Sequence, residues 1–362
     1  MSALISRAKA AIKTILGPVD SMMANVGASS SRMAGIYWLV RGGFGREQQA
    51  VLAGKKMYRA SLSDPTINTS LLRRNTHRIE KGMLMRPRRV PFGLTYIEET
   101  VHAFHRAVSA GIEPNELAWA RDVLLEYMAI TPSHPQVDPL REIVLDASEK
   151  VGAQNNLKRV PYHRDTDFAP SFNIHDFIAL AKHRRSVRWY ASTPIPREMI
   201  ALAVEAATYS PTACNRQPYE FRIFDSPELV SEIIRVPGGT AGFNDQVPAV
   251  AVIVGKLRNY FGQHDRHAIY TDASLAIMSF VYALELQGIG SCCINWPDIE
   301  EREQRMGNLL RLEADERPVM LVSFGWPDKS SMVAYSEKKP ASKLCRFNHE
   351  PAQATHALRD GR

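Results

Sequence analysis

Hydrophobic residues recur at helical spacing through the first half of the chain. The pattern predicts five helices, at residues 47–61, 67–85, 96–110, 114–129 and 139–151. Pro114 and Pro139 suit first helical turns, and Gly111 suits a helix end. No alternation typical of strands interrupts this part, so we expect an all-helical extension over residues 46–160.

Short apolar runs alternate with helical segments in the second half. Four strands are predicted, at residues 220–224, 249–255, 290–295 and 318–324. Asn173, with Asp176 three residues later, predicts the start of one helix, and Pro196 the first turn of another. Helices that alternate with strands indicate an α/β or α+β class.

The helix expected at residues 272–287 differs from the others, because its apolar residues cover nearly the whole circumference. A helix that is apolar all round is normally buried all round. Gly288 suits the left-handed residue that ends a helix, and Gly290 suits close packing of the next strand. We expect this helix at the centre of the fold.

Periodicity stops between residues 155 and 171, where Pro161 and Pro170 stand among mixed charges. We place the boundary of the second domain there, at residues 171–350. The Gly/Ala/Ser run at residues 27–31 predicts a break near the other end. Residues 1–45 are expected to form a flexible basic arm.

The arm contains a helical apolar stripe opposite a basic face. The apolar positions are Leu4, Ile5, Ala8, Ala11, Ile12 and Ile15, and the basic ones are Arg7, Lys9 and Lys13. Such a helix can lie on an anionic membrane, or it can pack on its own body or on a partner subunit. We favour packing, because amphipathic helices are common in soluble proteins.

The 362 residues carry a formal net charge of +7, which favours anionic partners without selecting among nucleotides, glycans and membranes. The four cysteines include no C-x-x-C pair, and they are interpreted as thiols in a reducing compartment. We see neither a secretory signal nor an apolar run of the roughly 20 residues that span a bilayer. A soluble, cytoplasmic protein without a nucleic-acid partner is expected.

A cluster of donors follows the first helix of the second domain. It contains Arg184, Arg185, Ser186 and Arg188. Guanidinium groups match phosphate oxygens with two parallel hydrogen bonds, so this segment is a candidate phosphate grip. The alternative is a solvated basic helix end that complements the helix dipole.

A second stretch, residues 210–219, reads Ser-Pro-Thr-Ala-Cys-Asn-Arg-Gln-Pro-Tyr and offers amide donors at short range. Together the two stretches resemble the FMN-dependent nitroreductase family, in a long form with an N-terminal helical extension. The resemblance covers roughly half of the chain. It implies an α+β fold with a mixed sheet wrapped by helices, assembled as a homodimer whose long central helix lies in the interface.

The resemblance also assigns roles to individual positions. Arg184, Arg185 and Ser186 match phosphate contacts, and Arg188 matches the basic residue at the N1 edge of the flavin. Pro211, Thr212 and Asn215 match the loop that reaches the flavin across the dimer. Other cofactor positions are implied near the ring and the phosphate: Asn244, Ile294, Asn295 and Lys338. Trp296 stands where the family often has Gly, so we expect its indole to alter the substrate space.

The implied activity is two-electron transfer from NAD(P)H through bound FMN to an electron-poor acceptor, such as a nitroaromatic or a quinone. No side chain is assigned as a catalytic acid. Two alternatives stay open: a flavin enzyme of the same fold that acts on a biosynthetic intermediate, for example in polysaccharide synthesis, and a non-catalytic protein that binds an anionic partner.

The non-catalytic alternative depends on the basic patch at residues 73–89, where His77, Glu80 and Lys81 share a helix face. A solvated face or a subunit contact is the favoured interpretation of this patch. The histidine pairs His102/His105 and His264/His267 lack metal-ligand spacing, so no metal site is expected. Neither G-x-G-x-x-G nor a Walker A loop occurs, which disfavours a Rossmann domain and a P-loop NTPase.

Overall fold

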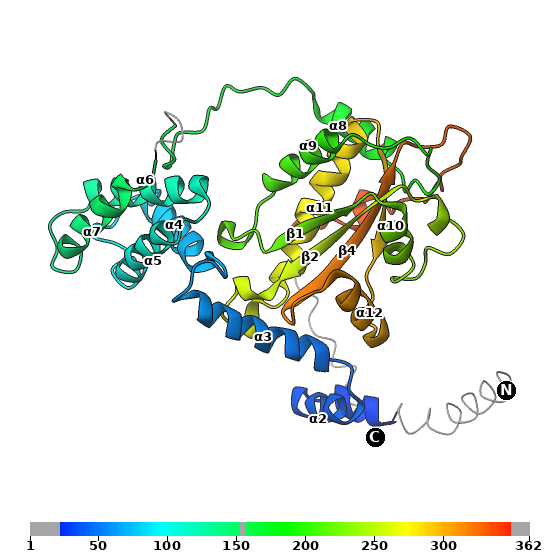
Figure 1. The fold of residues 1–362 in the computed structure, drawn as a ribbon, viewed down its shortest axis with the longest axis horizontal. Helices are drawn as coiled ribbons and strands as arrows, with labels where there is room; N and C mark the ends of the chain where they lie inside the picture. The colour runs from blue at the N-terminus through cyan, green and yellow to red at the C-terminus, as the bar shows by residue number, and fades with distance from the viewer. Residues whose placement is uncertain (1–21, 153–156, 349–362) are drawn as a thin grey trace.

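The computed structural model describes residues 22–152 and 157–348. Figure 1 shows a bundle of helices beside a sheet that is flanked by further helices. The predicted α+β class is confirmed. The amphipathic stripe predicted within residues 4–15 lies outside the described residues.

Two helical segments precede the extension. Residues 22–28 are helical, and α2 spans Ser31–Arg41 with the Ser30 hydroxyl accepting a hydrogen bond from Met33 N at 3.3 Å. The predicted break at residues 27–31 therefore separates two helices. α2 buries none of its residues.

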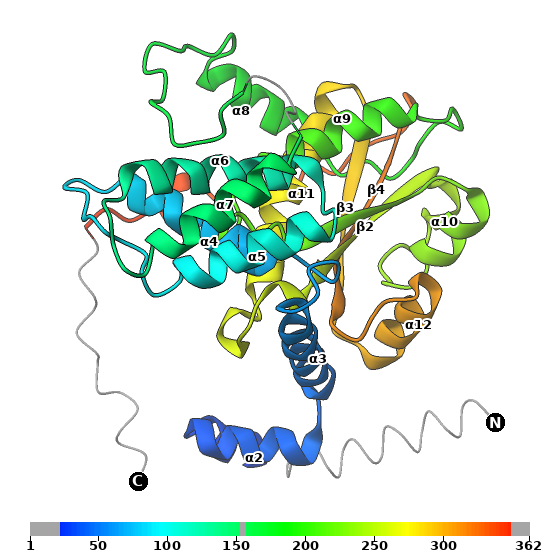
Figure 2. The same cartoon turned by 60° about the vertical axis from the view of Figure 1, so that its left-hand side comes forward.

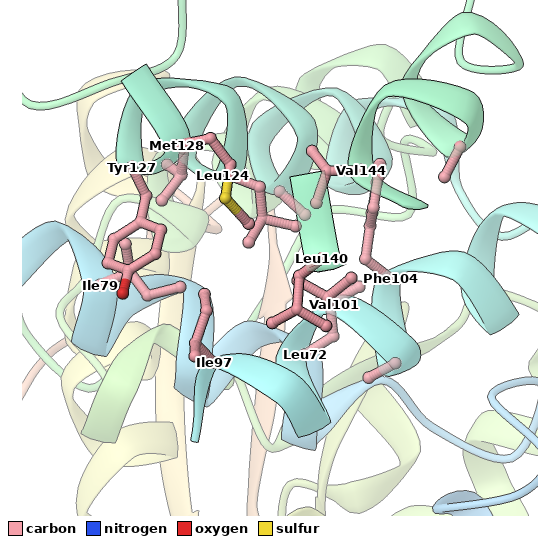
Figure 3. Packing of buried hydrophobic residues seen from close by; sticks show 14 of the residues in the cluster. Leu72, Ile79, Ile97, Val101, Phe104, Leu124, Tyr127, Met128, Leu140 and Val144 are labelled. Atoms are coloured by element: carbon pink, nitrogen blue, oxygen red, sulfur yellow. The ribbon is translucent and has the colours of Figure 1, made fainter. Parts of the chain in front are cut away.

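The described part of the extension contains helices joined by loops and no strand, as predicted. Its helices are α3 (Gly45–Ser61), α4 (Ser70–Met83), α5 (Ile97–Ser109), α6 (Pro114–Ile130) and α7 (Asp138–Glu149). Helices α4–α7 enclose an apolar core, part of which Figure 3 shows. Its centre includes Ile79 of α4, Phe104 of α5, Leu124 of α6 and Val144 of α7, all fully buried. The bundle therefore has a hydrophobic core of its own.

Helix α3 packs against the sheet-centred unit rather than inside the bundle. A Cβ atom at Gly54 would lie 2.8 Å from Leu257 of the short 3-10 helix η3 (Leu257–Asn259), so only glycine permits this approach. Ala50 of α3 joins Leu257, Tyr260 and Ile269 in a small apolar cluster. This contact connects the extension to the sheet-centred unit.

The sheet contains four strands in the order β1-β2-β4-β3. They are β1 (Tyr219–Phe224), β2 (Ala249–Lys256), β3 (Gly290–Asn295) and β4 (Glu316–Gly325), close to the predicted ranges. Every strand pair is antiparallel, where a mixed sheet was expected; one isolated parallel bridge joins Ser186 to Ser291.

Strand β2 shows why helices cover both faces of the sheet. Val250, Val252 and Val254 join one core cluster, which includes residues of α10 (Pro227–Ile234) and α12 (Glu300–Leu310). Ala249, Ala251 and Ile253 join another, with α9 (Arg197–Thr208) and α11 (Ala268–Leu286). Successive side chains point to opposite faces, so a continuous apolar run fits a strand that is buried on both. Figure 2 shows α9 and α10 at different sides of the sheet.

Helix α11 is only partly buried within one chain. Phe280 and Leu284 are fully buried, but Leu275, Met278 and Leu286 are 45%, 38% and 72% exposed. The prediction of burial on every side is therefore wrong for the single chain. By length and composition, the stretch Gln263–Leu286 could cross a membrane. From the sequence we expected no apolar run of that length. The buried face of α11 packs on the sheet.

Candidate functional site

The predicted phosphate grip is held against the start of β3. Helix α8 (Ile174–His183) begins with the expected capping box of Asn173 and Asp176 and ends before Arg184. Val187 N then donates to Ser291 O at 3.0 Å, which places the segment alongside the strand. A Cβ atom at Gly290 would lie 2.8 Å from Val187, so glycine permits this contact.

Five predicted site residues line one polar cavity of about 70 Å³. They are Arg184, Arg185, Ser186, Arg188 and Lys338, and Ala334 and Ser336 complete the lining. No carboxylate within residues 22–152 or 157–348 forms an ion pair with these four cations. Concentrated positive charge without a protein counter-ion favours a bound anion.

A second cavity of about 370 Å³ adjoins the first, and Arg188 lines both. Ile294 and Asn295, both predicted, line it at the end of β3, opposite Gly238 and Gly239. The Arg188 guanidinium lies 5.9 Å from the centre of the Phe243 ring. The two cavities thus offer a cationic end and a wider space that Arg188 and Arg302 border.

Two predicted positions do not line the larger cavity. The Asn244 side-chain amide donates instead to Asp245 at 3.1 Å, in the short helix η2 (Asn244–Gln246). Trp296 is 8% exposed, and its indole N–H donates to Glu303 inside the core. The expectation that its indole alters the substrate space is therefore wrong, because the ring turns away from the cavity.

Some lining residues were missed from the sequence. Phe243, Cys292, Cys293 and Arg302 line the larger cavity. The Pro-Gly-Gly sequence at residues 237–239 predicts a turn and could have drawn attention to this side of the cavity. Gly238 has φ of 74° in that turn. Burial raises the pKa of the Cys292 thiol, so this group stays neutral at pH 7.

The predicted flavin loop, which contains Pro211, Thr212 and Asn215, has an unusual backbone. Cys214, Asn215 and Gln217 have φ of 54°, 53° and 48°, which non-glycine residues adopt only at a cost. Gln217 N donates to Thr212 Oγ1 at 3.1 Å, and Ala213 N donates to Asp272 Oδ2 of α11 at 3.0 Å. These bonds hold the loop in its strained form.

Within one chain the loop and the grip lie at opposite ends of α11. The loop contacts Asp272, whereas His183, next to the grip, lies 2.6 Å from Glu285. Thirteen residues separate these two positions, which is about 20 Å along a helix that rises 1.5 Å per residue. A single chain therefore does not bring the two predicted halves of the site together.

Several known proteins resemble part of this chain. A model of the nitroreductase family matches residues 181–241 and 232–326. Iodotyrosine deiodinase 1 of Pongo abelii is 21% identical over 228 residues, which cover 55% of this chain and 78% of that protein. A Methanothermobacter thermautotrophicus protein, provisionally named NADH dehydrogenase/NAD(P)H nitroreductase, is 24% identical over 156 residues, 42% of this chain and 78% of its own length.

A solved structure titled FMN-dependent nitroreductase, from Clostridium difficile, is 20% identical with a TM-score of 0.41. That match covers 48% of this chain and 99% of the other. The family match includes the grip, the loop and β3, and it ends before Lys338.

Proposed function

Residues 181–326 of this chain belong to the nitroreductase family, and from this premise we propose an FMN-dependent oxidoreductase that transfers electrons from NAD(P)H to an electron-poor small molecule. The observation that carries the proposal is the cationic cavity and the larger cavity with which it shares Arg188. Bound FMN would supply the two-electron chemistry. The chain supplies binding, orientation and charge.

The residues present fit the phosphate of FMN. Arg184, Arg185 and Lys338 provide cations, and the Ser186 hydroxyl provides a further donor in the same cavity. Lys338 contributes charge without the fork geometry of arginine. The narrow cavity thus suits a compact dianion.

The larger cavity suits the ring system. Arg188 borders it beside the Phe243 ring, and β3 contributes Ile294 and Asn295. A fixed cation at this edge stabilises negative charge on a bound ring in its reduced form. We assign no side chain as a catalytic acid.

We further propose a homodimer in which two α11 helices pack antiparallel about a two-fold axis. This arrangement would place the loop of one chain near the grip of the other. The exposed apolar side chains of α11 offer the required surface, together with Leu202 of α9 and Tyr209 just after it, which are 57% and 83% exposed. We also propose that this dimer is cytoplasmic, which its four free cysteines support.

The dimer can be tested by Met278→Glu. We expect the dissociation constant of the dimer to rise by a factor of about 100 or more, because an unpaired charge is costly to bury. Analytical ultracentrifugation measures the change, and FMN retention should fall with it. Leu145→Glu, at a side chain that is 56% exposed on α7, is the matched control and should stay dimeric. A dimeric Met278→Glu variant would contradict this interface.

The proposed activity is tested by the visible spectrum of the purified protein without oxygen. We expect oxidised flavin absorbance that bleaches when NADH or NADPH is added. If the absorbance persists, NADH and NADPH do not reduce the flavin, and the proposed electron donor is wrong. If the protein binds no FMN even after reconstitution, the proposed function is wrong.

The related proteins named above include a deiodinase and a provisional nitroreductase, so the family alone leaves the acceptor open. Action on a biosynthetic intermediate therefore remains a second candidate. The non-catalytic alternative has less support, because Arg73 and Arg74 already form ion pairs with Glu116 and Glu99, at 2.9 and 3.2 Å. The guanidinium of Arg78 also lies 3.7 Å from the centre of the Tyr96 ring.

A further inference from the structure

The helical extension holds the strained loop from outside the family domain. Arg73 of α4 donates from Nε to Asn215 O at 2.8 Å. One of its terminal nitrogens donates to Gln217 Oε1 at 3.1 Å, and the other to Glu116 Oε2 at 2.9 Å. All three guanidinium nitrogens are therefore engaged, two of them by the loop.

The surroundings of Arg73 restrict its movement. Its side chain is 16% exposed and that of Glu116 is 12% exposed, so the ion pair is largely shielded from water. The guanidinium also lies 5.5 Å from the centre of the Trp119 ring. Trp119 in turn donates to Glu80 at 3.0 Å. A side chain fixed by this many groups can hold another segment in place.

The loop needs such support because its backbone is unfavourable. Asp272 of α11 binds the loop at Ala213, and Arg73 of α4 binds it at Asn215 and Gln217. Strained conformations persist only when surrounding contacts enforce them. Losing Arg73 would remove its bonds to Asn215 and Gln217, and Gln217 would keep its side-chain bond to Thr208 O at 3.0 Å.

Arg73 leaves part of Asn215 available. It binds the backbone oxygen of Asn215, whereas the side-chain amide of that residue has no hydrogen-bond partner in the described part of the chain. Asn215 is exposed. Fixing the backbone therefore fixes the direction of an amide that can still bind a ligand.

We propose that Arg73 is a positioning residue of the flavin site, through which the helical extension sets the conformation of residues 213–217 against the flavin of the partner subunit. This inference rests on the proposed function and dimer. It gives the extension a role in the site, although the family match begins at residue 181.

The test compares Arg73→Gln with Arg74→Gln in the full chain. Arg74 is a matched control, because it lies on the same helix and donates to Asn75, Glu99 and Tyr58 instead of the loop. We expect Arg73→Gln to raise the FMN dissociation constant by a factor of about 10, roughly the size of one lost charge-assisted bond. Arg74→Gln should change it by less than about twofold.

A second readout does not require flavin. Amide hydrogen exchange in residues 213–217 should accelerate in Arg73→Gln and stay unchanged in Arg74→Gln, with circular dichroism confirming that both are folded. Arg73→Lys keeps the charge but not the fork, so it should fall between wild type and Arg73→Gln. This milder variant also covers the case in which Arg73→Gln does not fold.

Equal exchange and equal FMN affinity in the Arg73 and Arg74 variants would overturn the positioning role. That failure is distinct from failure of the proposed function, in which the wild-type protein itself would bind no FMN. Faster loop exchange without any change in FMN affinity would also overturn the role, because the loop conformation would then not matter to the flavin.

Discussion

Replacing Arg184 and Lys338 together by glutamine should lower the affinity for FMN by a factor of about 100 or more. Each substitution removes a charge-assisted hydrogen bond to the phosphate, worth about 1.5–3 kcal/mol. The two cations line the same cavity, and no carboxylate in the described ranges pairs with either. Flavin fluorescence titration measures the change.

Riboflavin is the control ligand for this prediction, because it has the same ring system as FMN but lacks the phosphate. Its affinity should be nearly the same in wild type and in the double variant, so the preference for FMN should disappear. Arg235→Gln, which removes an exposed cation that pairs with Asp245, should leave both affinities unchanged. An equal loss of FMN and riboflavin would show that the cavity does not bind the phosphate.

Phe280→Ala in α11 should reduce the free energy of unfolding by about 3–5 kcal/mol. Phe280 is fully buried, with ring centres of Phe221 and Phe324 at 5.1 and 5.9 Å. Truncation leaves a cavity between the helix and two strands that the surroundings refill only in part. Urea denaturation at fixed protein concentration measures the loss.

Leu52→Ala is the control for this substitution, since Leu52 on α3 is 65% exposed. Its effect should stay within about 0.5 kcal/mol, as for most surface substitutions. A comparable loss in both variants would mean that the core between α11 and the sheet is not a main source of stability.

Elements defined by local pattern could be predicted from the sequence. The β2 run Ala249–Lys256 is apolar and β-branched, which identifies a strand buried on both faces. The extension helices carry clear 3.6-residue periodicity and Pro or Gly at their ends. The single chain leaves part of α11 exposed, and composition alone could not show which face of the helix the chain itself covers.

Contacts between distant segments could not be predicted. Arg73 and Asn215 are 142 positions apart in the chain, and no local pattern pairs them. The left-handed backbone at Cys214 was equally hidden, because residue type indicates such conformations mainly for glycine. Family resemblance located the grip and the loop, whereas the helical extension has no counterpart in the family match.

The separation of loop and grip along α11 has a genetic consequence. In the proposed dimer each of the two sites takes its grip from one chain and its loop from the other. A chain defective only in the grip and a chain defective only in the loop would form a mixed dimer with one doubly damaged site and one intact site. Mutations in the two regions would therefore fall into separate complementation groups, and two inactive alleles could together restore half of the sites in each mixed dimer.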